Sequence, residues 1–189
     1  MSKSEQRASL APRRRRGCFQ FSLRTLLLAM LALGVVLGRF VQSVQKQQQA
    51  VSRITGYGGH VTYDYQLDAW GEFRRDSSGN YLRDLKPPGP RWLRRFVGDH
   101  YFQTAVRVWL GSEEGVGFLD RELEALAGPL NSLPSLKVLD LTGSPITDAG
   151  LAHLRGLTQL KRLDLRGTKA TNRGIQSLQR ELPQCEIVR

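Results

Sequence analysis

The sequence predicts an α/β chain in which a short solenoid, of about three strand-and-helix repeats plus a terminal strand, follows a single N-terminal transmembrane helix. Three observations lead to this prediction. An apolar segment preceded by basic residues lies near the N-terminus, and a leucine pattern recurs in the C-terminal part of the chain. The length of 189 residues is enough for one domain but not for a large multidomain enzyme.

Residues 19–41 are predicted to form the transmembrane helix. The uncharged stretch 25–38 holds only 14 residues, whereas a helix needs about 20 to cross the hydrocarbon core of a bilayer. Arg24 and Arg39 border this stretch, and their long side chains can extend to the lipid headgroups, which lengthens the usable span. The segment is therefore expected to be a single membrane anchor.

Two alternatives remain open for this segment. A cleaved signal peptide has the same basic start and apolar centre, and its removal would leave an exported chain. The cleavage site would be weak, because residues 36–38, Val-Leu-Gly, match the small-x-small pattern poorly and the apolar run continues to Val41. A buried helix of a soluble protein would leave the four consecutive arginines at 13–16 without a role.

The basic excess is concentrated before the apolar segment. The formal net charge is +11, and residues 1–25 carry seven basic and one acidic side chain, whereas residues 104–189 carry 11 and 10. Residues 1–18 have little to bury and are expected to be a disordered, cytoplasmic basic tail that contacts anionic lipid. By the positive-inside bias, everything after about residue 41 is expected on the extracytoplasmic side. The charge thus indicates membrane topology, and nucleic acid is not an expected partner.

The middle of the chain is predicted to join the anchor to the repeats. Residues 42–57 are expected to continue outward as a juxtamembrane helix, and residues 58–103 to form a connecting and capping region. Within that region, the alternation of apolar residues over 60–67 predicts a strand. Asp76–Asn80 predicts a turn in an irregular loop or ragged hairpin.

Residues 91–97, Arg-Trp-Leu-Arg-Arg-Phe-Val, predict a short amphipathic helix behind a proline-rich connector. Trp92, Leu93, Phe96 and Val97 fall on one side of this helix, and the arginines fall on the other. Such a helix can lie on a membrane surface, or it can cap the apolar end of the repeats. Capping is the favoured interpretation, because the ends of a repeat array need cover.

A leucine pattern occurs twice, with periods of 24 and 25 residues. The first copy has apolar residues at Leu136, Leu139, Leu141, Ile146, Leu151, Leu154 and Leu157, which match Leu160, Leu163, Leu165, Ala170, Ile175, Leu178 and Leu182 of the second. The Leu-x-x-Leu-x-Leu start predicts a short strand, and the later leucines predict a helix that packs on it. Thr147 or Asp148, and Thr171 or Asn172, are expected to cap these helices at their N-termini.

A less regular unit precedes the two copies, and a partial unit follows them. The strand of the earlier unit is indicated by Val106, Val108 and Leu110, and its helix by Leu123, Leu126, Leu130 and Leu133. After Leu182 the chain starts one more strand, in which Cys185 takes the place of a leucine and is expected to be a buried, structural thiol. The repeat domain is therefore predicted over 104–189.

The repeat resembles the leucine-rich repeat family in its strand-and-helix form, with the Ile-Thr-Asp-Ala-Gly-Leu motif at 146–151. More loosely, the whole chain resembles small bacterial membrane-anchored leucine-rich repeat proteins. In these, an anchor motif, Phe-Ser-Leu-Arg-Thr-Leu-Leu at 21–27, accompanies a glycine turn with Tyr-Asp-Tyr at 58–65 and a Gly-Asp-x-Tyr-Phe segment at 98–102. The resemblance implies a fold and a membrane location, and it implies no reaction.

No catalytic, cofactor-binding or metal-binding residues are expected. The sequence has no nucleophile elbow, phosphate-binding loop, dinucleotide fingerprint or His-Glu-x-x-His motif. Its two cysteines and three histidines are too few and too scattered for a standard structural zinc site. Asp140 and Asp164 occupy equivalent positions one repeat apart and can approach each other, but neighbouring lysines and arginines can neutralise them.

The expected function is that of a membrane-anchored, non-enzymatic repeat module that binds an unknown protein partner. An exported repeat protein and an accessory subunit of an enzyme are the alternatives. Repeat proteins bind partners along extended surfaces, and the strand face is the candidate surface. Its candidate residues are Lys137, Val138, Asp140, Thr142, Lys161, Arg162, Asp164 and Arg166.

Overall fold

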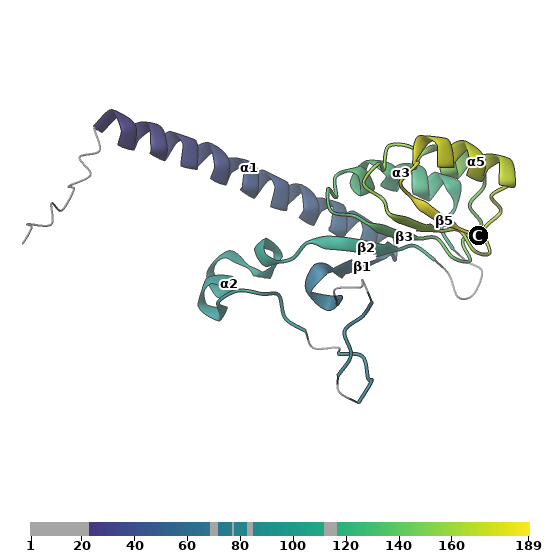
Figure 1. Cartoon of the computed structure of the whole chain (residues 1–189), viewed down its shortest axis with the longest axis horizontal. Helices are drawn as coiled ribbons and strands as arrows, with labels where there is room; N and C mark the ends of the chain where they lie inside the picture. Colours follow the sequence, from purple (N-terminus) through teal and green to yellow (C-terminus); the bar gives the residue numbers. More distant parts are fainter. Residues whose placement is uncertain (1–22, 69–71, 77, 83–84, 112–116) are drawn as a thin grey trace, which may run out of the picture. The chain divides into compact units, whose positions relative to one another are not determined.

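The computed structural model describes residues 23–68, 72–76, 78–82, 85–111 and 117–189. These residues form a mixed α/β structure with a five-stranded sheet and one long apolar N-terminal helix (Figure 1). The chain divides into two units, Met1–Arg39 and Phe40–Arg189. The predicted basic tail, 1–18, and the first four residues of the predicted membrane segment lie outside the described residues.

Helix α1 (Leu23–Gly56) covers the described part of the predicted anchor and nearly all of the predicted juxtamembrane helix. Its 34 residues make it about 51 Å long at 1.5 Å per residue. By length and composition it is able to cross a membrane. The residues of α1 in the first unit are all exposed, whereas Ala50 and Ile54, close to its C-terminal end, belong to the buried core of the second unit.

The sheet contains five strands in the order of the sequence: β1 (His60–Tyr63), β2 (Ala105–Trp109), β3 (Val138–Asp140), β4 (Arg162–Asp164) and β5 (Glu186–Val188). β1 pairs antiparallel with β2, and the other three strand pairs are parallel. The register places Val108, Leu139, Leu163 and Ile187 side by side. One period of the sequence pattern therefore corresponds to one step across the sheet.

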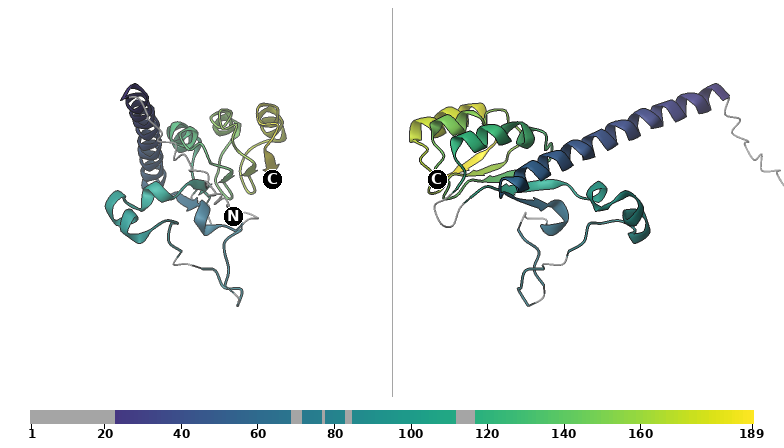
Figure 2. Two further views of the ribbon diagram at one scale, coloured as in Figure 1. Left: turned by 60° about the vertical axis from the view of Figure 1, so that its left-hand side comes forward. Right: turned by 180° about the vertical axis from the view of Figure 1, so that it is seen from behind.

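Three helices connect the parallel strands and lie on one face of the sheet (Figures 1 and 2): α3 (Asp120–Asn131), α4 (Asp148–Ala152) and α5 (Asn172–Glu181). The core lies between the sheet and these helices. The matched apolar positions of both copies are buried, apart from the half-buried Ile175, and so is Cys185. Burial of one leucine side chain contributes about 1.5–3 kcal/mol, so the repeated leucines are the main source of stability in this unit.

The N-termini of these helices are linked from one unit to the next. Thr147 and Thr171 are the N-caps of α4 and α5, and each hydroxyl accepts a hydrogen bond from a backbone amide of its own helix at 3.2 Å. Each threonine also donates its amide and its hydroxyl to an aspartate of the preceding unit, Thr147 to Asp120 and Thr171 to Asp148. Of the two cap residues expected for each helix, the structure therefore uses the threonine.

The strand predicted over 60–67 is shorter than expected. It ends at Tyr63, and Asp64–Gln66 form a single turn of 3-10 helix, η1. The Gln66 side chain accepts a hydrogen bond from the Tyr63 amide at 2.8 Å, which holds the chain in this turn. The apolar alternation in the sequence continues past the end of the strand. There, the Tyr65 ring stacks on the Tyr63 ring, with 6.0 Å between the ring centroids.

The segment after η1 contains the turn that the sequence predicts. The Asp76 carboxylate accepts the backbone amides of Ser78 and Asn80 at 2.8 and 2.9 Å. An isolated β-bridge joins Arg75 to Tyr81 across this turn. The described part of this segment is therefore an irregular hairpin.

The predicted helix over 91–97 is confirmed as α2 (Arg91–Val97), but the prediction that its apolar side caps the core is wrong. α2 buries no residue, and Trp92 and Phe96 are exposed. Sequence periodicity identifies an apolar side without telling which side meets the rest of the protein, and in this helix Arg94 packs inward. Strand β1, from the same connecting region, is the element that covers an edge of the parallel strands.

Candidate functional site

The candidate partner-binding residues lie on or beside the face of the sheet opposite helices α3 to α5, which we call the open face. Side chains alternate along a strand, so the neighbours of the buried Val108, Leu139 and Leu163 point to this face. Strand register arranges them in two rows. Thr62, Arg107, Val138, Arg162 and Glu186 form the first row, and His60, Trp109, Asp140, Asp164 and Val188 form the second.

The structure brings the eight candidate residues together at equivalent places in two adjacent units. Four belong to β3 and its flanks and four to β4 and its flanks: Lys137, Val138, Asp140 and Thr142, then Lys161, Arg162, Asp164 and Arg166. Register pairs Val138 with Arg162 and Asp140 with Asp164. Both lysines and both arginines are exposed, so cations dominate the accessible part of this group.

Asp164 is bound by its neighbour and is only 5% exposed. The Arg166 guanidinium donates to its carboxylate from Nε at 2.9 Å and from Nη2 at 2.8 Å. Burial by itself raises the pKa of the Asp164 carboxyl, but the hydrogen bonds from the side chain and backbone of Arg166 outweigh it, so this pKa lies below its ordinary value. Asp164 is therefore ionised at neutral pH and is not a general acid.

Both aspartates also hold the turn that follows their strand. Asp140 Oδ1 accepts the Thr142 amide at 3.0 Å, and Asp164 Oδ1 accepts the Arg166 amide at 3.2 Å. Such side-chain bonds to the amide two residues later are typical of aspartate in turns. Local hydrogen bonding is thus a sufficient reason for an aspartate to recur at this point of the sequence pattern.

Three further residues of the open face were missed in the sequence. The rings of His60 and Trp109 stack with 5.5 Å between their centroids, and the Arg107 guanidinium carbon lies 5.6 Å from the centre of the Phe73 ring. Alternation on either side of the buried Val108 is a signal that could have identified Arg107 and Trp109. The antiparallel pairing that brings His60 beside them cannot be read from residue spacing.

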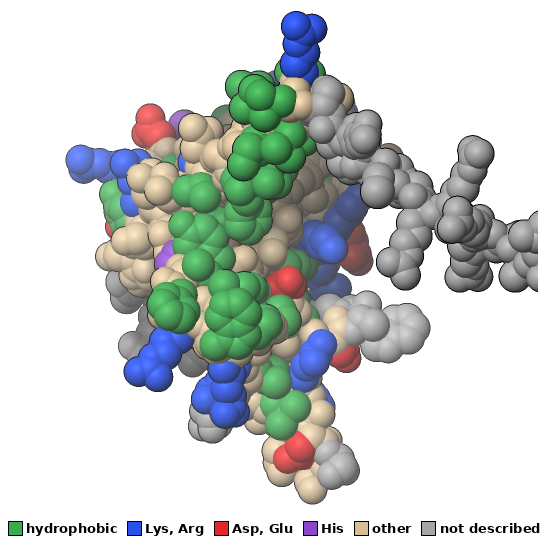
Figure 3. Space-filling view, turned by 90° about the vertical axis from the view of Figure 1, so that its left-hand side faces the viewer, with side chains coloured by type: hydrophobic (Ala, Val, Ile, Leu, Met, Phe, Trp, Pro, Cys, Tyr) green, Lys and Arg blue, Asp and Glu red, His purple; other side chains and the backbone are tan. Residues whose placement is uncertain are grey.

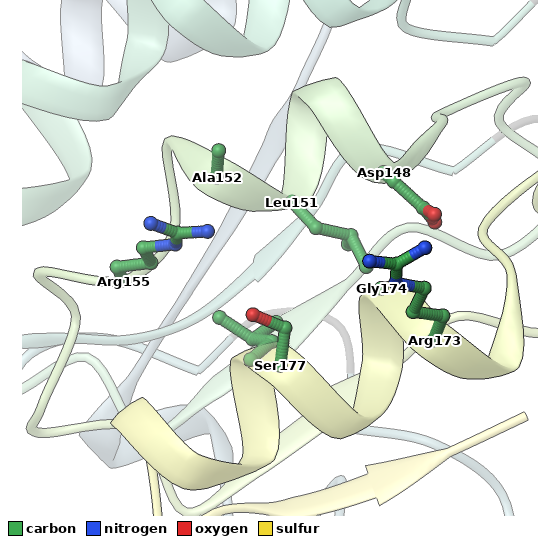
Figure 4. Close-up of a pocket in the computed structure, with 8 residues that line it drawn as sticks. Asp148, Leu151, Ala152, Arg155, Arg173, Gly174 and Ser177 are labelled. Carbon is green, nitrogen blue, oxygen red and sulfur yellow. The ribbon is translucent and has the colours of Figure 1, made fainter.

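A shallow cleft of about 310 Å³ lies between α4 and α5, on the helical side (Figure 4). Asp148 and Arg173 lie at one end and Arg155 at the other (Figure 4). Of the eight residues that line the cleft none is a histidine or cysteine, the only hydroxyl is that of Ser177, and the only carboxylate, Asp148, is bound to Thr171. The lining therefore lacks the paired nucleophile and base of covalent catalysis.

Within the described residues, no three His, Cys, Asp or Glu side chains are grouped so that they could hold a metal ion. Comparisons with family models, with curated proteins and with solved structures find no match for this chain.

Proposed function

We propose that this protein is a membrane-anchored leucine-rich repeat protein whose open face binds a protein partner. The observation that carries the proposal is the step from Leu139 to Leu163: 24 residues in sequence, and one strand in the sheet. Units of one strand and one helix whose leucines share a core are characteristic of leucine-rich solenoids. We assign residues 104–189 to such a solenoid, with about three repeats and β5 as the terminal strand.

In this proposal α1 is the single membrane anchor. Its exposed apolar side chains before Arg39 suit contact with lipid, and its polar C-terminal part leads into the folded unit. Seven basic residues before or at the start of the apolar stretch favour a cytoplasmic N-terminus. The open face then acts on the extracytoplasmic side.

The partner that complements the open face has an acidic surface. Lys137, Lys161 and Arg162 are exposed on the open face and its margin at β3 and β4, whereas the Asp164 carboxylate is buried against Arg166. Opposite charge on the partner favours encounter and fixes its orientation. At the β2 end, Trp109 adds an aromatic side chain of the kind enriched in protein interfaces.

Proximity labelling with the full chain in its source cell tests the open face. Lys161→Glu with Arg162→Glu reverses two exposed charges, and we expect this variant to lose a specific group of labelled proteins. Arg155→Glu with Arg180→Glu is the matched control, because both residues are exposed on the helical side. Arg166 is left unchanged because it binds Asp164. Identical labelled proteins in wild type and in the first variant would contradict the proposal.

Extraction tests the anchor separately. We expect the chain to remain in the membrane pellet after alkaline carbonate treatment, and a tag placed after Arg189 to be accessible from outside the cytoplasm. Release by carbonate or by high salt would contradict the anchor. A shortened chain that begins after residue 38 would instead identify the segment as a cleaved signal peptide.

A further inference from the structure

Helix α2 turns its apolar side away from the protein. Phe96 is 85% exposed and Trp92 is 65% exposed. Only Leu93 and Arg94 of this helix are partly buried, and the Arg94 side chain is only 10% exposed. An amphipathic helix ordinarily faces the core with its apolar side. The opposite orientation of α2 leaves two large aromatic side chains for a partner outside the protein.

Basic side chains form an open cleft beside these aromatic residues. Lys86, Arg91, Arg94 and Arg95 line the cleft together with one acidic residue, Asp99. Arg94 Nη1 lies 3.3 Å from Asp99 Oδ1, but Arg94 Nε is buried and has no hydrogen-bond partner among the described residues. A buried donor without an acceptor is unfavourable. The cleft thus supplies the positive charge that a phosphate group needs, because four of its five lining side chains are basic.

A contact within the second unit joins the segment that follows α2 to Phe40, in helix α1. The turn η2 (Asp99–Phe102) follows α2 after a single glycine, and its Tyr101 ring lies 6.1 Å from the ring of Phe40. Phe40 directly follows Arg39, the first charged residue after the apolar stretch. If α1 crosses a bilayer, the residues that contact Phe40 are therefore near the bilayer surface.

We propose that α2 is an interfacial helix that binds the anionic phospholipid surface around the anchor. Trp92 and Phe96 enter the boundary between headgroups and acyl chains, and the basic cleft binds lipid phosphate. Figure 3 shows exposed hydrophobic side chains with Lys and Arg side chains beside them. The inference rests on the proposed membrane anchor, and it adds a second, peripheral contact with the same membrane.

The first test measures the depth of Trp92 in the bilayer. The full chain with Trp70→Phe and Trp109→Phe keeps Trp92 as its single tryptophan, and it is reconstituted into anionic vesicles that contain lipids brominated at different depths. Interfacial helices lie about 5–10 Å into the headgroup–acyl boundary, so we expect shallow bromines to quench Trp92 more strongly than deep ones. Emission that is equal with and without bromine would overturn the proposal.

Surface variants then separate the apolar from the electrostatic contribution. Phe96→Ser removes an exposed aromatic ring, and Arg91→Glu with Arg95→Glu reverses two exposed charges. Both variants are expected to reduce the quenching of Trp92, and replacement of the anionic lipid by phosphatidylcholine is expected to reduce it in the parent chain. If neither the charge reversal at Arg91 and Arg95 nor the exchange for phosphatidylcholine changed the quenching of Trp92, the proposed binding of lipid phosphate would be refuted.

Matched controls come from the repeats. Leu119→Ser changes another exposed apolar residue, and Arg121→Glu with Arg180→Glu reverses exposed charges on α3 and α5. These controls are expected to leave the quenching of Trp92 unchanged. A loss equal to that of the α2 variants would show that the signal comes from overall charge or apolarity, and it would refute the role of α2.

A measurement on the wild-type chain avoids any effect of the substitutions on folding. A phospholipid that carries a photoactivatable diazirine in its upper acyl chain is expected to cross-link to residues 91–97, as mapped by mass spectrometry. Retention of the chain after carbonate treatment without such cross-links would overturn the role of α2 and leave the anchor intact. Release by carbonate together with absent cross-links would overturn both.

Discussion

The Asp148 carboxylate, in the first turn of α4, accepts two hydrogen bonds from Thr171, the N-cap of α5. The Thr171 amide donates to one oxygen at 2.7 Å, and the Thr171 hydroxyl donates to the other at 2.6 Å. Asp120 and Thr147 repeat this arrangement one unit earlier, at 2.9 and 2.5 Å. We call each pair an Asp–Thr link, and it explains why threonine and aspartate stand together at the start of α4.

Removal of one Asp–Thr link is expected to destabilise the repeats. Asp120→Ala deprives two donors of Thr147 of a charged acceptor, and hydrogen bonds to charged groups are each worth about 1.5–3 kcal/mol. Because Asp120 is only half-buried and water can replace part of the lost acceptor, we expect the free energy of unfolding to fall by about 1.5–3 kcal/mol in total, which is the worth of one such bond. Urea denaturation of the full chain in detergent micelles measures it. Glu124→Ala, at an exposed position of the same helix, should change it by less than about 0.5 kcal/mol. Equal effects would show that the link contributes nothing.

The glycines of the repeat are expected to be intolerant of alanine where an aspartate approaches them. A Cβ atom at Gly150 would collide with the Asp120 carboxylate, and one at Gly174 with that of Asp148. Gly150→Ala should therefore destabilise by about 1–3 kcal/mol, as overpacking usually does. At Gly128 of α3 a Cβ atom meets nothing within 4 Å, so Gly128→Ala should stabilise by about 0.5–1 kcal/mol. Thermal unfolding measures the change in stability of each variant. A change of the same sign for Gly150→Ala and Gly128→Ala would contradict this prediction.

Asp164 is expected to make stability depend on pH in the acid range. Its pKa in the folded chain lies below the ordinary value, so its contribution is fully present above the unfolded pKa of about 3.9 and is lost as pH falls through the folded-state pKa. Asp164→Asn removes that contribution at every pH. The difference in unfolding free energy between wild type and variant should therefore be largest at neutral pH and shrink below about pH 4. A difference that stays constant with pH would refute the role of the ionised carboxylate.

Cys185 is expected to be an unreactive thiol in the folded protein. Burial, with a smaller effect of Glu186, raises the pKa of this thiol and so lowers the fraction of reactive thiolate. Iodoacetamide at neutral pH should modify Cys185 much more slowly in the folded chain than in urea, as followed by mass spectrometry of its peptide. Equal rates in the two states would show that the fold does not shield this residue.

The leucine positions of the repeats could be predicted because burial there follows a fixed period. Leu139 and Leu163 are paired on adjacent strands, and both are fully buried. A repeated spacing in the sequence therefore corresponds to a repeated position in the core. Cys185 was predicted to be buried by the same alignment, although its chemistry differs from that of leucine. Periodicity thus identifies the core and the order of strands and helices, and the family resemblance itself stays a prediction.

Features that depend on contacts between elements could not be predicted. The bonds between Asp148 and Thr171 require two helix N-termini to lie side by side, which no local pattern encodes. The inward packing of Arg94 depends on which side of α2 meets its neighbours. On the open face, Asp164 had the right position for a binding residue, but its pairing with Arg166 leaves its carboxylate little exposed to a partner.

The Asp–Thr link also bears on how such an array can change in length. The 24-residue stretch from Thr147 to Ala170 contains the threonine of one Asp–Thr link, Thr147, and the aspartate of the next link, Asp148. If this stretch were duplicated in tandem, the threonine of the first copy would bond to Asp120. The threonine of the second copy would bond to the aspartate of the first copy, and Thr171 would bond to the aspartate of the second copy. Every junction would be complete without a new substitution. Because Thr147 and Asp148 are adjacent in the sequence, a duplication of this stretch would carry both partners of the link and would preserve the contact between neighbouring helix N-termini.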